Sequence, residues 1–87
     1  MTNETRITKM TSRLEAELSP SSMKIEDESH LHAGHAGAKS GKGHFKLTIN
    51  SEKFKGMRPL QKHRLIYEAL GDLMETDIHA LTIQIPS

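Results

Sequence analysis

The sequence predicts an α/β (more narrowly α+β) fold in one small domain, residues 1–87, with the order αββααβ and helices packed on a three-stranded mixed sheet. Apolar residues three and four apart predict the helices, and strict alternation predicts the strands. At 87 residues the chain has room for one modest core. With two Phe, one Tyr and no Trp, we expect that core to rest on Leu, Ile and Met.

The first two predicted elements are a helix and a short strand. The helix carries apolar residues at helical spacing, namely Ile7, Met10, Leu14 and Leu18. Pro20 ends it, because the residue before a proline is disfavoured in the helical region. Met23 and Ile25 then alternate with charged residues, which indicates a strand.

A Gly- and His-rich segment, residues 30–43, comes next and has too little apolar surface to pack. We therefore expect a long exposed loop. After it, Phe45, Leu47 and Ile49 alternate with polar residues and predict a half-buried strand. The two strands fit an antiparallel hairpin.

The second half of the chain predicts two helices and a last strand. Pro59 suits a first helical position, and Gly71 followed by Asp72 indicates a break between a longer and a shorter helix. The apolar residues near helical spacing are Leu60, Ile66, Tyr67, Leu70, Leu73 and Met74. Residues 78–85 predict a strand with His79, Leu81, Ile83 and Ile85 on one face. A right-handed crossover should make it parallel to one earlier strand.

Composition excludes several classes of protein. Without Cys the chain forms no disulfide, has no catalytic thiol and cannot ligate an iron–sulfur cluster or structural zinc by thiolates of its own. It shows no secretory signal and no stretch of about 20 apolar residues, so we expect a cytoplasmic protein with no membrane partner. No nucleophile elbow, phosphate loop or buried carboxylate pair is recognisable, which argues against an enzyme.

Histidines are the first candidate site. His30, His32, His35 and His44 are close in sequence, and neutral imidazole is the commonest protein metal ligand. The loop alone lacks the order of a structural zinc site, and a solvated hairpin loop is the simpler alternative. A lone His such as His79, at the start of a strand, is more often structural than a ligand. The loop and the start of the last strand could share one end of the sheet, which would bring a loop His near His79.

A basic segment, residues 53–64, is the second candidate site. Its cations are Lys53, Lys55, Arg58, Lys62 and Arg64, and it contains no acid. Basic residues near a helix N-terminus suit a phosphate, which favours nucleic-acid backbone contact or docking on an acidic protein. An ordinary solvated helix face is an equal alternative. Stacking of single-stranded bases is disfavoured, because the nearby aromatic residues are Phe54 and Tyr67, and Tyr67 shares the helical phase of the core.

Several segments together resemble the BolA family and cover most of residues 18–85. They are Asp27-Glu28-Ser29, His44-Phe45-Lys46-Leu47, Phe54-Lys55-Gly56, Pro59-Leu60-Gln61-Lys62-His63-Arg64-Leu65-Ile66-Tyr67 and Ile78-His79-Ala80-Leu81. Lys62 departs mildly from the pattern, which often has Arg there. The resemblance implies a fold like a type II KH domain, in agreement with the predicted order of elements.

The resemblance also implies a non-enzymatic adaptor that binds a monothiol glutaredoxin and shares a [2Fe-2S] cluster with it, for cluster trafficking or iron and redox sensing. The glutaredoxin and its glutathione would supply thiolates, and the last-strand His of the family maps onto His79. The family's second ligand, Cys or His, comes from the loop between the first two strands. Without Cys a His must serve: His35 is preferred by its spacing from His44, with His32 and His30 as alternatives.

Other family properties give the remaining expectations. His44 is interpreted as a strand-end residue, and His63 as structural or part of an interface. The isolated protein is expected to be a monomer without a cofactor. Bacterial family members are described as transcriptional regulators of cell shape and stress responses, so DNA binding through residues 53–64 is the alternative function. The expected location is the bacterial cytosol, and an organelle is the alternative.

Overall fold

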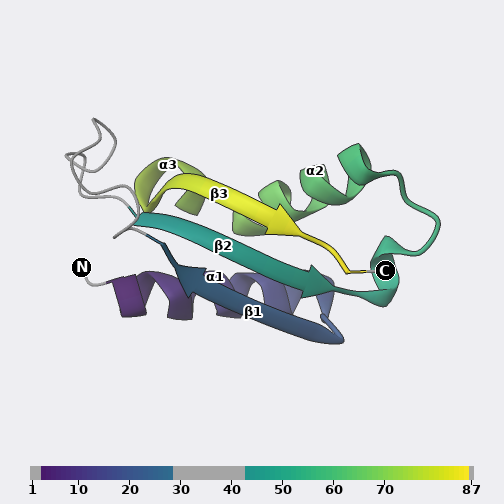
Figure 1. Cartoon of the computed structure of the whole chain (residues 1–87), viewed down its shortest axis with the longest axis horizontal. Helices are drawn as coiled ribbons and strands as arrows, with labels where there is room; N and C mark the ends of the chain where they lie inside the picture. Colours follow the sequence, from purple (N-terminus) through teal and green to yellow (C-terminus); the bar gives the residue numbers. More distant parts are fainter. Residues whose placement is uncertain (1–2, 29–42, 87) are drawn as a thin grey trace.

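The computed structural model describes residues 3–28 and 43–86. The elements, shown in Figure 1, are α1 (Asn3–Leu18), β1 (Ser22–Asp27), β2 (Gly43–Asn50), the 3-10 helix η3 (Glu52–Phe54), α2 (Pro59–Leu70), α3 (Leu73–Thr76) and β3 (Ile78–Gln84). The predicted order αββααβ is confirmed, and η3 lies within the predicted connection. The predicted loop lies outside the described residues except for Gly43, which opens β2.

The sheet has β2 in the centre and β1 and β3 at its edges (Figure 1). β1 runs antiparallel to β2, with Met23 opposite Ile49, and β2 runs parallel to β3, with Phe45 opposite Leu81. Both predicted pairings are therefore confirmed. The parallel pairing places the starts of β2 and β3 at the same end of the sheet.

One hydrophobic core joins α1 and α2 to the sheet. Its buried side chains come from every helix and from β2 and β3: Met10, Leu14, Leu18, Phe45, Leu47, Ile49, Phe54, Ile66, Ala69, Leu70, Leu73 and Ile78. Both Phe residues belong to it, so the core does not consist of Leu, Ile and Met alone. Each fully buried Leu, Ile, Met or Phe side chain stabilises the fold by about 1.5–3 kcal/mol relative to the same side chain left exposed.

The predicted inward direction of two α2 residues is wrong. Leu60 is 62% exposed and Tyr67 is 41% exposed, whereas Ile66 and Leu70 are buried. Successive helical residues are about 100° apart, so a helix that buries Ile66 turns Tyr67 toward its flank. Leu60 is seven positions before Tyr67 and therefore lies on the same exposed side.

A residue with positive φ follows each of the two long helices, α1 and α2. α1 ends at Leu18, and Ser19 then adopts a positive φ of 44° before Pro20. Gly71 has φ 55°, and a Cβ at this position would lie 3.2 Å from Arg13 Nη1. Glycine therefore suits the break between α2 and α3, as the sequence predicted. Within the described ranges, no helix is both long and apolar enough for a membrane crossing.

Candidate functional site

Two imidazoles lie beside each other where β2 and β3 begin. The ring centroids of His44 and His79 are 4.9 Å apart, and the ring planes are tilted by 51°. His44 is 5% exposed, whereas His79 is exposed. We call these two residues the histidine pair.

An irregularity in the β2–β3 pairing brings His79 to the surface. Gly43 is opposite Ile78 but His44 is opposite Ala80, so His79 is the additional residue of a bulge. Ile78 is buried in the core instead. The expectation that His79 shares the apolar face of Leu81 and the following residues is therefore wrong, because the bulge shifts the alternation by one position.

The end of β1 and the start of β2 lie at this same end of the sheet, with Asp27 opposite Phe45. The backbone N–H of Glu28 donates to the carbonyl oxygen of His44 at 2.8 Å, and Gly43 N–H donates to the carbonyl oxygen of Asp77 at 3.0 Å. Glu28, directly after β1, and Gly43, the first residue of β2, thus lie beside the histidine pair. The predicted loop ligands His35, His32 and His30 lie outside the described residues.

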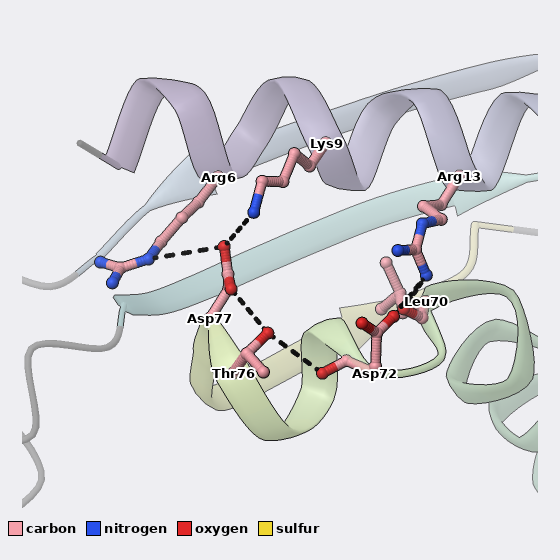
Figure 2. Close-up of polar contacts among 7 residues, drawn as sticks. All are labelled: Arg6, Lys9, Arg13, Leu70, Asp72, Thr76 and Asp77. Atoms are coloured by element: carbon pink, nitrogen blue, oxygen red, sulfur yellow. Dashed lines mark hydrogen bonds and ion pairs between the residues drawn. The ribbon is translucent and has the colours of Figure 1, made fainter. Parts of the chain in front are cut away.

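A buried carboxylate holds the turn that precedes His79. Asp77 is 4% exposed, and its carboxylate accepts hydrogen bonds from the Thr76 hydroxyl at 2.7 Å and from Lys9 Nζ at 3.1 Å (Figure 2). Arg6 Nε lies 3.9 Å from the same carboxylate. The Thr76 hydrogen bond and these two α1 cations lower the pKa of Asp77, although burial opposes the shift.

A second contact links α1 to the break between α2 and α3. Arg13 Nη1 donates to the Asp72 carboxylate at 2.8 Å and to the carbonyl oxygen of Leu70 at 3.1 Å (Figure 2). The hydrogen bond from Arg13, together with its charge, lowers the pKa of Asp72. Helix α1 therefore contacts both ends of α3, the second of which leads directly into the strand of His79.

The histidine pair is the candidate metal-binding group among the described residues. Residues 3–28 and 43–86 contain no group of three or more His, Asp or Glu side chains arranged to hold an ion. Two imidazoles leave a metal with incomplete coordination, because structural sites use four ligands. Imidazole nitrogen also suits one iron of a two-iron cluster, as in centres where His replaces Cys. The described residues thus supply too few ligands for a self-contained site, and His79 is the exposed imidazole of the pair.

The predicted basic residues make different contacts in the structure. Lys53 Nζ donates to the carbonyl oxygen of Glu17 at 2.6 Å and so satisfies the C-terminal end of α1. Lys55 and Lys62 line one hollow of about 440 Å³ together with Ser21, Asn50, Ser51, Glu52, Phe54, Gly56 and Pro86. We call it the lysine hollow.

The other two basic residues are not among those that line the hollow. Arg58 is exposed at the N-cap of α2, where its backbone N–H donates to Gln61 Oε1 at 3.0 Å. Arg64 is exposed two positions after Lys62, which places the two side chains on opposite sides of the helix.

Part of this site could have been found from the sequence. His44 opens the second predicted strand and His79 opens the third, and parallel strands begin at the same end of a sheet. The position of His44 at a strand end agrees with this, but the sequence pattern does not indicate that His44 contacts His79. The Lys9–Asp77 ion pair joins residues 68 positions apart, and neither residue carries a motif that signals the contact.

Comparisons with known proteins agree with this architecture. A family model described as BolA-like protein matches residues 14–87. Protein BOLA1, chloroplastic, from Arabidopsis thaliana is 42% identical over 83 residues, which cover 92% of this chain and 52% of the relative. BolA-like protein 1 from Mus musculus is 43% identical over 72 residues, which cover 83% and 50%. The chain thus spans about half the length of these relatives.

A bacterial relative carries a different name. The DNA-binding transcriptional regulator BolA from Vibrio cholerae is 41% identical over 71 residues, which cover 82% of this chain and 64% of the relative. Some relatives are thus named only for the family, and others for DNA-binding transcriptional regulation.

Solved structures show the same fold. The BolA domain of SufE1 from Arabidopsis thaliana superposes with a TM-score of 0.77 at 39% identity, covering 90% of this chain and 86% of that one. The solution structure of BolA1 from Mus musculus gives 0.74 at 40% identity, covering 93% and 65%. The small α+β fold is confirmed, while the type II KH likeness stays a prediction. From residue 14 onward this chain carries the sequence and fold of BolA-like proteins, and it belongs to that family.

Proposed function

We propose that this protein is a non-enzymatic adaptor that binds a monothiol glutaredoxin and shares a [2Fe-2S] cluster with it, for cluster trafficking or iron and redox sensing. The observation that supports this most is the exposed imidazole of His79 beside His44. The chain has no Cys, so any thiolate ligand must come from the glutaredoxin and its glutathione. Two imidazoles on one iron would raise the potential of such a cluster relative to an all-thiolate site.

Several histidines of this chain are candidates for the second ligand to the cluster. His35 is our first choice, and His32 and His30 are alternatives on the same segment. His44 joins them, because it is the described imidazole in ring contact with His79. Ligation requires a neutral imidazole, so binding should weaken as the ligand protonates.

Visible circular dichroism tests the adaptor function. Wild-type protein, added anaerobically to cluster-loaded monothiol glutaredoxin, should change the cluster spectrum, and His79→Ala should abolish most of that change. The control Glu15→Ala shortens an exposed side chain of α1 outside the histidine pair and should behave as wild type. Identical, unchanged spectra with wild type and His79→Ala would contradict the proposal.

The same titration identifies the second ligand. His35→Ala, His32→Ala, His30→Ala and His44→Ala are compared one at a time, each after a check of folding by far-ultraviolet circular dichroism. The variant that reproduces the His79→Ala spectrum identifies the partner of His79. Loss of the signal only in His44→Ala would contradict our preference for His35.

DNA binding is the second candidate function. It is favoured by Lys55 and Lys62, which share the lysine hollow, and by the name of the Vibrio cholerae relative. Phosphate contacts by Lys are sequence-independent and weaken steeply with salt. The cytosol remains the expected location, although the first relative named above is chloroplastic.

A charge-reversal pair tests this second candidate. Lys55→Glu combined with Lys62→Glu should weaken binding to duplex DNA and reduce the salt slope by about two, one for each lysine that no longer binds a phosphate. Lys24→Glu combined with Lys46→Glu is the control, because it makes the same change in net charge on the sheet. Equal affinities and salt slopes in both double variants would exclude the lysine hollow as a DNA site.

A further inference from the structure

The two edges of the sheet differ in charge. β1, at one edge (Figure 1), carries Lys24, Glu26 and Asp27, and Lys24 Nζ lies 3.3 Å from the Glu26 carboxylate. β3, at the other edge, has the sequence Ile-His-Ala-Leu-Thr-Ile-Gln and contains no Lys, Arg, Asp or Glu. Charged side chains protect an edge strand against pairing with another chain. By this criterion β1 is protected and β3 is not.

The side chains of β3 are also accessible. Ala80, Thr82 and Gln84 are exposed, whereas Leu81 and Ile83 are half-buried against the core. β2 pairs with one side of β3, and no strand in the described parts of the chain pairs with the other. Seven residues without an internal proline are enough for a further strand to pair along the edge.

The position of His79 indicates what would pair there. His79 is the second residue of β3, and under the proposed function its thiolate co-ligands come from another protein. A partner that reaches His79 already lies at the beginning of this edge. Addition of a strand to a sheet edge is a common mode of recognition, in which backbone hydrogen bonds give affinity and alternating side chains give specificity.

We infer that the outer edge of β3 is the docking surface for the thiolate-supplying partner, which adds an extended segment as a fourth strand. This inference rests on the proposed function and specifies how that partner is held. The added segment should alternate apolar and neutral polar residues. Its apolar side chains would then cover the exposed parts of Leu81 and Ile83, and its polar ones would lie beside Thr82 and Gln84.

Hydrogen exchange of the β3 amides is the direct test. Cluster-loaded monothiol glutaredoxin should slow exchange along β3 and leave β1 unchanged. Thr82→Lys places a charge in the middle of this edge and should weaken binding about tenfold. Ser22→Lys is the matched control, because Ser22 is an exposed residue on the opposite edge, and it should bind as wild type does.

The outcomes separate this inference from the proposed function. If the cluster spectrum changes but β3 exchanges as in the free protein and Thr82→Lys binds normally, edge docking is wrong and the adaptor function stands. If neither the spectrum nor the exchange changes, both are wrong. If His79→Ala abolishes the spectral change and keeps the β3 protection, docking by the edge is supported independently of ligation.

Sedimentation of the chain alone tests whether a second copy of this chain, instead of the glutaredoxin, occupies the edge. A second copy would also be able to pair with the uncharged edge of β3. A dimer that forms without glutaredoxin and disappears in Thr82→Lys, but not in Ser22→Lys, would overturn the inference and assign the edge to self-association. A monomer under the same conditions leaves β3 available to the partner and supports it.

Discussion

The two ends of β2 are held by different kinds of interaction. At the end with the histidine pair, Gly43 N–H donates to the carbonyl oxygen of Asp77, whose carboxylate is bound by Lys9. At the other end, Asn50 Nδ2 donates to the carbonyl oxygen of Pro86 at 2.8 Å, and Ser51 Oγ donates to that of Leu18 at 2.6 Å. Charged groups thus fix the first end, and mainly neutral hydrogen bonds fix the second.

This difference predicts that the two ends can be perturbed separately. The charged contact comes from Lys9 in the first half of α1, whereas the neutral ones involve Leu18, the last residue of α1, and Pro86, which follows β3. The candidate iron site depends on the first set and the lysine hollow on the second. Variants that affect one end without the other would support two independent surfaces, and variants that affect both would argue for one coupled unit.

The largest expected effect comes from a core residue that lies between the two ends of β2. Leu47 is fully buried in the middle of β2, so Leu47→Ala leaves a cavity and should lower the free energy of unfolding by about 2–5 kcal/mol. Urea denaturation measures this change. The amide chemical shifts of Gly43 and Asn50 should both move. A shift at only one end would show that the core does not connect them.

How far the sequence predicts this molecule depends on the range of each interaction. Helix and strand spacing are local, which is why α1, β2 and the break at Gly71 were predictable. The direction of Tyr67 was not, because periodicity locates a stripe without saying which neighbouring stripe the sheet covers. The bulge that exposes His79 is likewise a property of pairing between two strands, and neither strand alone encodes it.

Asp77→Asn should affect the histidine end alone. It keeps an oxygen for the Thr76 hydroxyl but removes the charge that binds Lys9, with an expected loss of about 1.5 kcal/mol in the free energy of unfolding. The ring resonances of His44 and His79 should shift, while the amide of Ser51 should not. Thr82→Asn is a control with the same product residue at an exposed position of β3. Equal ring shifts in the two variants would contradict a role for Asp77 in placing the histidine pair.

Ser51→Ala is the counterpart at the other end. Ser51 is buried, donates to Leu18 and accepts a hydrogen bond from Lys53 N–H at 3.2 Å, so its loss should cost about 1 kcal/mol. The amides around Lys53 and Lys55 should exchange faster, with the histidine rings unchanged. Ser21→Ala removes an exposed hydroxyl at the same hollow and should cost less. A perturbed histidine pair in Ser51→Ala would show that the ends are coupled through β2.

The smallest effect concerns the ion pair that joins α1 to the break between α2 and α3. The hydrogen bond from Arg13 lowers the pKa of Asp72 in the folded state, so this contact contributes stability above the unfolded carboxyl pKa of about 3.9. That contribution disappears as the pH falls through the lower folded-state value, because the carboxylate is then protonated in both states.

Asp72→Asn should therefore be slightly less stable than wild type at pH 7, and the difference should vanish as the pH falls through the folded-state pKa of Asp72. Urea midpoints across that range measure it, with Glu75→Gln as a matched control at an exposed position of α3. Salt should reduce the difference at pH 7, since Asp72 is exposed and its ion pair is screened. A difference that persisted at low pH would show that the Arg13–Asp72 ion pair does not account for the lost stability.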